Sequence, residues 1–354
     1  MRSHLLPKIG VISAMTLIPV GSQAITFNLN DITPGGMNAA ALQAFQDATA
    51  IWEGLIINDI EVNLDIRFDD NDINGNPFGT SVLASTSRSL VTPSYTAVRG
   101  ALIAETTPSA NDLTAIANLP SGPSLSFRTN VTGSTNNGNV IIDNDASNNN
   151  NFLDVNTANA KALGLINANS PGNDAGIAFN SSFYWDYDQS DGVGAGLQDF
   201  VGVTVHEIGH ALGFRSGVDS VDASHGAGPF TPQDLDAFAV VTVADLFRYN
   251  APGQLDLAAG GAPYYSLDGG TTNIALFSTG SFNGDGRQAS HWKDNLGLGI
   301  FDPTANPPGQ INVLSQLDLD AIDVIGYDLN LIPEPSTTLL TLVTLGFAAR
   351  RRKR

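Results

Sequence analysis

Two histidines and a glutamate have the residue types and the spacing of half a catalytic zinc site. They lie in the run His206-Glu207-Ile208-Gly209-His210, an H-E-x-x-H pattern within a segment of helical character. Residues four apart on a helix lie one above the other on the same face, so both imidazoles can reach one ion. Catalytic zinc takes a third protein ligand and a water molecule. The pattern therefore predicts a zinc site in which Glu207 is the general base for hydrolysis.

The third zinc ligand must come from the few side chains that remain. Of the five histidines, His4 belongs to the apolar N-terminal stretch, which leaves His225 and His291. Two aspartates close to the motif, Asp219 and Asp222, are further candidates. Spacing alone does not choose among these four residues.

Two absences in the sequence narrow the chemistry. The chain has no cysteine, which excludes disulfides, thiolate ligands and a cysteine nucleophile. After Glu207 the next glutamate is Glu334, close to the C-terminus. The arrangement of the thermolysin-like enzymes, in which a later helix supplies a glutamate ligand, is therefore excluded.

The elements that must position these side chains predict an α+β domain with a twisted mixed sheet. Apolar residues recur at helical spacing in an N-terminal segment, the segment that carries the motif is predicted to be a second helix, and three shorter segments have the pattern of strands. The predicted helices are 37–57, 197–212 and 317–327, and the predicted strands are 61–68, 175–180 and 264–271. Residues 231–250 have helical character, and 108–160 are predicted to be mostly surface loop with a short strand at 140–142.

Charge excludes one class of partner. Seven of the 16 basic residues lie at the two ends of the chain, so the body carries nine (16 − 7) against 35 acidic residues. Such a surface repels polyanions, and no nucleic-acid partner is expected. Only 14% of the residues are charged, and the Gly-, Asn-, Ser- and Thr-rich remainder is typical of exported proteins.

The two ends of the chain predict export. Residues 1–24 have the basic, apolar and small-residue order of a secretory signal peptide. Residues 332–354 combine Pro333-Glu334-Pro335, an apolar run at 338–349 and a basic end, and resemble the PEP-CTERM sorting tail of Gram-negative bacteria. The resemblance implies an exosortase-type processing enzyme, transient membrane anchoring through 338–349 and delivery to the periplasm, cell surface or extracellular matrix. A permanent C-terminal anchor is the alternative. The catalytic domain is then 25–331.

The residues after the motif resemble the metzincin metalloproteases. Gly213 stands where a positive φ would end the helix, which gives H-E-x-x-H-x-x-G, but Ser216 occupies the position of the usual third ligand. The later run Ser290-His291-Trp292 is similar to the third-ligand segment of the leishmanolysin-like metzincins. The resemblance implies a zinc site of His206, His210 and His291. Phe301 stands in place of the methionine that lies beneath the zinc in that family.

The resemblance also implies the activity. It predicts a secreted zinc-dependent endopeptidase that binds extended protein or peptide substrates along the strand 175–180, through Ile177 and Phe179. Tyr327 is a candidate donor to the substrate carbonyl. The alternatives are a catalytically inactive, zinc-stabilised surface or matrix-binding protein, and a zinc hydrolase of a non-peptide bond. Asp70–Gly75 and Asp186–Gly192 have partial calcium-loop patterns, for which turns rich in aspartate and asparagine are the favoured interpretation.

Overall fold

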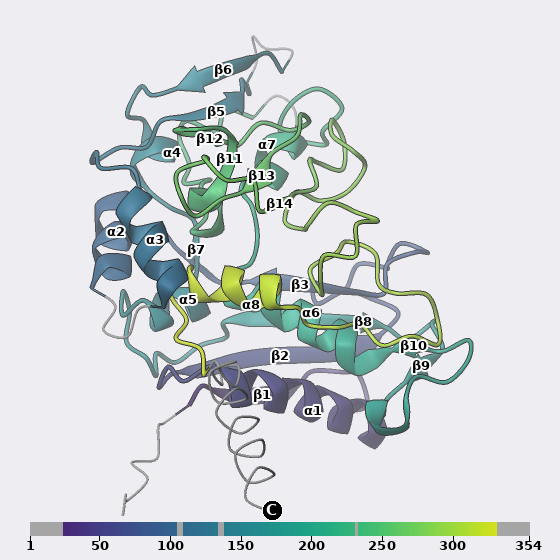
Figure 1. Ribbon diagram of the computed structural model, residues 1–354. Helices are drawn as coiled ribbons and strands as arrows, with labels where there is room; N and C mark the ends of the chain where they lie inside the picture. Colours follow the sequence, from purple (N-terminus) through teal and green to yellow (C-terminus); the bar gives the residue numbers. More distant parts are fainter. Residues whose placement is uncertain (1–23, 105–108, 134–137, 231–232, 331–354) are drawn as a thin grey trace, which may run out of the picture.

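The computed structural model describes residues 24–104, 109–133, 138–230 and 233–330 (Figure 1). The predicted sorting tail at 332–354 lies outside these ranges, as does the predicted signal peptide except for its last residue, Ala24. Within the described ranges, none of the helices combines the length and apolar character needed to cross a membrane.

A four-stranded sheet forms the lower part of the molecule (Figure 1). Its order is β1-β2-β8-β3, in which β1 (Thr26–Asp31), β2 (Glu61–Asp69) and β8 (Ala175–Asn180) are parallel. The last strand, β3 (Ala84–Arg88), pairs antiparallel with β8 and lies at the edge. The strands predicted at 61–68 and 175–180 are confirmed, and β2 shows the period-two burial that its sequence indicated.

Two long helices cover one face of this sheet. Phe179 of β8 stacks on Phe200 of α6 (Phe200–Leu212) with 4.1 Å between ring centroids, and its ring also lies 5.3 Å from Phe45 of α1 (Ala39–Leu55). The Trp52 indole on α1 donates to the carbonyl of Val205 on α6 at 3.2 Å. The helix that carries the metal-site motif is therefore held by contacts with both the sheet and the N-terminal helix.

The upper part of the molecule contains a second sheet of six short strands (Figure 1). Its order is β14 (Ala275–Leu276), β13 (Tyr264–Tyr265), β11 (Arg248–Ala251), β12 (Gln254–Asp256), β5 (Phe127–Asn130) and β6 (Val140–Asp143). The other helices are α2 (Tyr95–Ile103), α3 (Ala110–Asn118), α4 (Asn148–Asn151), α5 (Thr157–Ala162), α7 (Val218–Ala223) and α8 (Gln316–Asp323), with 3₁₀ turns η1 (Gln189–Asp191) and η2 (Ala244–Phe247). Two further pairs are β4 (Leu90–Val91) with β7 (Val155–Asn156), and β9 (Trp185–Asp186) with β10 (Gln198–Asp199).

Two predictions along the chain are wrong. The segment 108–160 is not mostly loop, because its polar residues cap short helices: Ser109 and Asp112 form a capping box at the start of α3. The segment 231–250 is not a helix. From residue 233 it is irregular up to η2 and then enters β11, and the β-branched run Val240–Val243 accounts for the difference, because such side chains disfavour helix.

The observed class is mixed α/β, with parallel and antiparallel pairing in the sheets. The closing helix predicted at 317–327 is present as α8, which is shorter. Before it, residues 277–315 contain no helix or strand longer than an isolated bridge. This irregular segment crosses the front of α6, and it carries both His291 and Phe301.

Candidate metal centre

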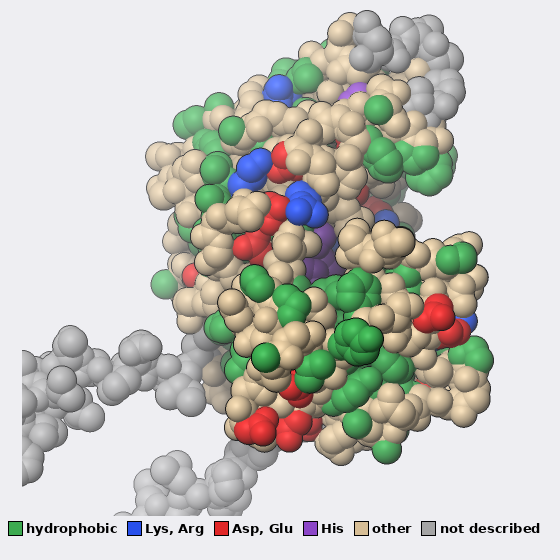
Figure 2. All heavy atoms as spheres, turned by 90° about the vertical axis from the view of Figure 1, so that its right-hand side faces the viewer, with side chains coloured by type: hydrophobic (Ala, Val, Ile, Leu, Met, Phe, Trp, Pro, Cys, Tyr) green, Lys and Arg blue, Asp and Glu red, His purple; other side chains and the backbone are tan. Residues whose placement is uncertain are grey.

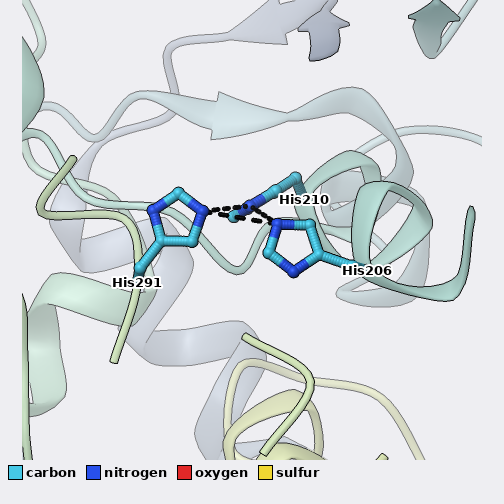
Figure 3. A group of neighbouring side chains, drawn as sticks. All are labelled: His206, His210 and His291. Atoms are coloured by element: carbon cyan, nitrogen blue, oxygen red, sulfur yellow. Dashed lines mark hydrogen bonds between the residues drawn. The ribbon is translucent and has the colours of Figure 1, made fainter. Parts of the chain in front are cut away.

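Three imidazoles converge between the lower and upper parts of the molecule (Figure 3). The Nε2 atom of His210 lies 3.0 Å from Nε2 of His206 and 3.1 Å from Nε2 of His291, and the last pair is 3.3 Å apart. His206 and His210 come from successive turns of α6, and His291 comes from the irregular segment 81 residues beyond His210. Within the described residues this is the one group of three or more His, Asp or Glu side chains whose ligand atoms converge.

The other ring nitrogen of each histidine faces a backbone carbonyl. Nδ1 lies 2.6 Å from the Ile300 carbonyl oxygen in His206, 2.7 Å from that of Phe214 in His210, and 3.2 Å from that of Gln288 in His291. Because a carbonyl only accepts, these contacts place the proton on Nδ1 and leave the lone pair on Nε2. Three lone pairs therefore point at one another, an arrangement that a cation between them would stabilise.

The spacing of the three nitrogens fits zinc. A tetrahedral ion with Zn–N bonds of about 2.0–2.1 Å has ligand atoms about 3.3–3.4 Å apart, close to the observed 3.0–3.3 Å. Burial lowers the pKa of His291 to about 3 and that of His210 well below its ordinary value, and the neighbouring histidines add to both shifts. Neutral imidazole is the form that binds a metal.

The end of α6 fixes the tautomer of His210. Gly213 has φ 117° and ends the helix in the left-handed conformation that its sequence position predicted. The chain therefore turns back, and the next carbonyl, that of Phe214, reaches the His210 ring. The Asn156 side chain donates to the carbonyls of His210 and Ala211 at 2.9 and 3.0 Å, which satisfies the last turn of the helix.

A partly buried carboxylate on α7, that of Asp219, holds the chain just before His291. Asp219 accepts from the backbone N–H groups of Ala289 and Ser290, at 2.6 and 3.2 Å, and from the Ser290 hydroxyl. The backbone N–H of Ser216 in turn donates to the Ser290 hydroxyl oxygen at 2.9 Å. Asp219, one of the alternative ligands, thus supports the third histidine and does not join it. Ser216 donates through its own hydroxyl to Asp245 at 2.5 Å.

A second carboxylate, that of Asp318 on α8, is fully buried and holds the chain beyond His291. It accepts from the Trp292 indole at 2.8 Å and from the Ile300 backbone N–H at 2.7 Å, and it also caps α8 through Ser315. Ile300 supplies the carbonyl that faces His206. The fully buried Asp318 therefore positions Trp292, which is next to His291, and Ile300, whose carbonyl faces His206.

Phe301 lies beneath the histidine pair of α6. Its fully buried ring is 6.1 Å from the His206 ring and 6.0 Å from the His210 ring, and it stacks on Phe214 at 4.0 Å. A Cβ atom on Gly209 would lie 2.1 Å from the edge of the Phe301 ring, so this helix position accommodates only glycine at that distance. The aromatic ring of Phe301 thus forms an apolar floor beneath the two α6 histidines.

Glu207 faces the cleft beside the histidines and contacts the edge strand. The Thr86 hydroxyl on β3 lies 2.6 Å from Glu207 Oε2 and 3.0 Å from the Glu207 carbonyl oxygen. Burial raises the pKa of Glu207, whereas His206 and the hydrogen bond from Thr86 act in the opposite direction. A carboxylate with a raised pKa is better matched to accepting and returning a proton near neutral pH.

The remaining candidate ligands lie elsewhere. Asp222 accepts from the backbone N–H groups of Phe282 and Asn283 at 2.8 and 2.7 Å. His225 is 4% exposed, and its Nδ1 lies 2.7 Å from the Val221 carbonyl oxygen. His225 is therefore a buried residue that does not belong to the group of three histidines. Tyr327 is also not available to a substrate, because its buried hydroxyl donates to the Leu212 carbonyl at 2.8 Å.

The three histidines line a cleft of about 1490 Å³ that runs across this side of the molecule. In Figure 2, histidine side chains are recessed near the centre of this face. Residues 80–86 and Arg88, at and before the edge strand, line one side, and the irregular segment around 287–308 lines the other. The cleft leaves the histidines accessible to a ligand of extended shape.

The predicted substrate contacts Ile177 and Phe179 are wrong. Both side chains are fully buried, because β8 is paired on both edges, with β2 and β3, and its Ile177–Phe179 face lies against the helices. A continuous apolar run is typical of such an interior strand. The strand that borders the cleft is β3, whose sequence Ala-Ser-Thr-Ser-Arg lacks an apolar alternation and gave no strand signal.

The two partial calcium loops form turns. Asp72 accepts from the backbone N–H groups of Asn74 and Asn76 at 2.9 and 2.8 Å, and Asp188 accepts from that of Ser190 at 2.8 Å. These are the local hydrogen bonds of aspartate-rich turns. Neither loop assembles three converging acidic or histidine side chains within the described residues.

Comparison of the chain with protein-family models, with curated proteins and with solved structures finds no match.

Proposed function

We propose that this chain is a secreted zinc-dependent endopeptidase of the metzincin type, with His206, His210 and His291 as the zinc ligands. The observation that carries the proposal is the set of three Nε2 lone pairs, 3.0–3.3 Å apart, each fixed by a carbonyl on the opposite ring nitrogen. A cleft long enough for a peptide and a buried glutamate beside the histidines support hydrolysis as the reaction.

Glu207 has the position of the general base. Zinc, when bound, supplies a Lewis acid that activates water and polarises the scissile carbonyl. Glu207 accepts the proton of the attacking water molecule and returns it to the leaving amine. The hydroxyl of Thr86 holds one carboxylate oxygen, which leaves the other free to face the cleft.

The peptide substrate lies along β3 in this proposal. This strand has β8 on one side and the cleft on the other, so its outer edge can pair with an extended chain. Thr86 lies in the middle of β3 and contacts Glu207, so a peptide paired with this edge passes over the histidines. The proposal also includes export through the segment 1–24 and sorting through the tail 332–354. These two parts of the proposal rest on the sequence alone.

The test compares the purified protein with its Glu207→Gln variant. Both should contain about one zinc per chain by elemental analysis. The parent should cleave casein or a peptide mixture, and a chelator should stop this cleavage. The variant should lose at least about 100-fold in kcat, the usual contribution of a general base. Unchanged cleavage by the variant would exclude Glu207 as the base. A zinc-loaded parent that cleaves no peptide would favour the non-proteolytic alternatives.

A further inference from the structure

One basic side chain of the cleft has no acidic partner. The chain between residues 25 and 331 has nine lysines and arginines. Six of these form ion pairs with aspartates: Arg67, Arg128, Lys161, Arg215, Arg287 and Lys293. Of the other three, Arg248 is 1% exposed and donates to backbone carbonyls, and Arg99 on α2 is partly buried near Tyr95. Arg88 is exposed and lines the cleft, with no described carboxylate within 4.0 Å.

Arg88 points to the same side of the edge strand as Thr86. Side chains two apart on a strand share a face and are about 7 Å apart along it. The Thr86 hydroxyl contacts Glu207, so the Arg88 side chain lies on the side of β3 that faces α6, and it lines the cleft together with the three histidines. The acidic groups nearby have partners of their own, because Asp294 pairs with Arg287 at 2.9 Å and Asp219 holds Ser290.

We propose that Arg88 binds a carboxylate of the substrate, so that the cleft selects peptides with an acidic side chain on the amino-terminal side of the scissile bond. This inference rests on the proposed function, because it names the substrate class of the same cleft. Between residues 25 and 331 the chain has 34 acidic residues (35 minus Glu334), so an unpaired arginine in the cleft is a local exception to a surface that repels acidic peptides.

The direction of the peptide follows from the strand. Antiparallel pairing is the more stable of the two arrangements, and in it the peptide runs opposite to β3. Thr86 marks the level of Glu207 and of the scissile bond. Peptide residues that lie opposite Arg88, two positions further along β3, therefore precede the scissile bond. A guanidinium can hold such a carboxylate by two parallel hydrogen bonds.

The experiment first locates the cleaved bonds by mass spectrometry, using a peptide mixture and the zinc-loaded parent. Matched peptides then carry either Glu or Gln at each of the three positions on both sides of the scissile bond. Cleavage by the parent, and binding to the zinc-loaded Glu207→Gln full-length chain, are both measured. The parent should favour Glu over Gln about 10-fold at one amino-terminal position. The Arg88→Gln variant should lose this preference, and Arg88→Glu should favour Lys at the same position.

Arg67→Gln is the matched control, since this arginine is paired on β2 away from the cleft and its loss should leave the preference unchanged. Cleavage without any Glu preference, or a preference that survives in Arg88→Gln, overturns the inference and leaves the proposed function intact. A preference confined to the carboxyl-terminal side also overturns it. If the parent cleaves no peptide, the proposed function fails, and the binding measurements still decide whether Arg88 holds a carboxylate.

Discussion

The contact between Gly209 and Phe301 offers a quantitative test of how the floor of the site is built. In an isolated helix, replacing glycine by alanine stabilises by about 1 kcal/mol. At Gly209 the added Cβ would lie 2.1 Å from Cε1 and 2.3 Å from Cζ of Phe301. Normal carbon contacts are about 3.5 Å, so the ring would have to move by about 1.4 Å.

The Phe301 ring has little room for that movement. It is fully buried and stacks on Phe214 at 4.0 Å with an interplanar angle of 14°. Overpacking of this kind costs about 1–3 kcal/mol. We expect Gly209→Ala to lower the free energy of unfolding by up to about 2 kcal/mol after the helix gain is subtracted, which places it about 1–3 kcal/mol below a helix Gly→Ala change without a clash. Displacement of Phe301 should also weaken zinc binding, because the ring lies about 6 Å from both helix histidines.

The assay is chemical unfolding of the single variants Gly209→Ala and Phe301→Leu and of the double variant. The smaller leucine removes the clash, so the two changes should couple favourably by about 1 kcal/mol or more. Gly100→Ala on α2 is the control, since nothing lies within 4 Å of the added Cβ. That control should be neutral or stabilising. A Gly209→Ala protein as stable as Gly100→Ala, or additive behaviour in the double variant, would refute the packing argument.

Three further predictions concern the metal ligands, a buried positioning carboxylate and pH. His291→Ala should abolish zinc binding measured by elemental analysis, whereas His225→Ala should retain it; the reverse would move the third ligand. Asp318→Asn places an amide donor against N–H groups, so it should lower the free energy of unfolding measured in urea by at least about 2 kcal/mol and weaken zinc binding. A variant with unchanged stability and unchanged zinc binding would contradict the role given to Asp318. Burial raises the pKa of Asp323 to about 7, so its protonated form stabilises the fold at low pH. That contribution, at most about 4 kcal/mol, is complete below about pH 4 and lost as pH rises through about 7. Asp323→Asn should flatten the pH dependence of the urea midpoint between pH 4 and 8, and an unchanged profile would contradict this.

The sequence predicted the lower part of the molecule well because local periodicity determines it. The helix α1 and the strand β2 have regular apolar spacing, and each is buried on the side that this spacing indicated, whereas β8 is a continuous apolar run that is buried throughout. The pair His206 and His210 is equally local, since helix geometry alone brings residues four apart together. Gly213 was identifiable for the same reason, from its position just past the motif.

The edge strand and the buried carboxylates could not be predicted from such patterns. The strand β3 is polar and is held by pairing with β8, a partner almost a hundred residues later, so no local signal marks it. Thr86 and Arg88 were missed with it. Asp318 resembles any other acidic residue near a helix start, and only the tertiary structure places Trp292 and Ile300 at its oxygens.

The position of the third histidine, His291, shows most clearly what local sequence patterns cannot predict. His291 lies in a segment without regular secondary structure, where no repeating backbone hydrogen bonds fix the chain. Two carboxylates replace them, the partly buried Asp219 from α7 before the histidine and the fully buried Asp318 from α8 beyond it. Its position therefore depends on the docking of two separate helices and not on its spacing from His210. For this reason a comparison of residue order with a known family pointed to His291, whereas spacing alone left four candidate ligands. Substitution of either aspartate should alter zinc affinity, although neither aspartate is a ligand.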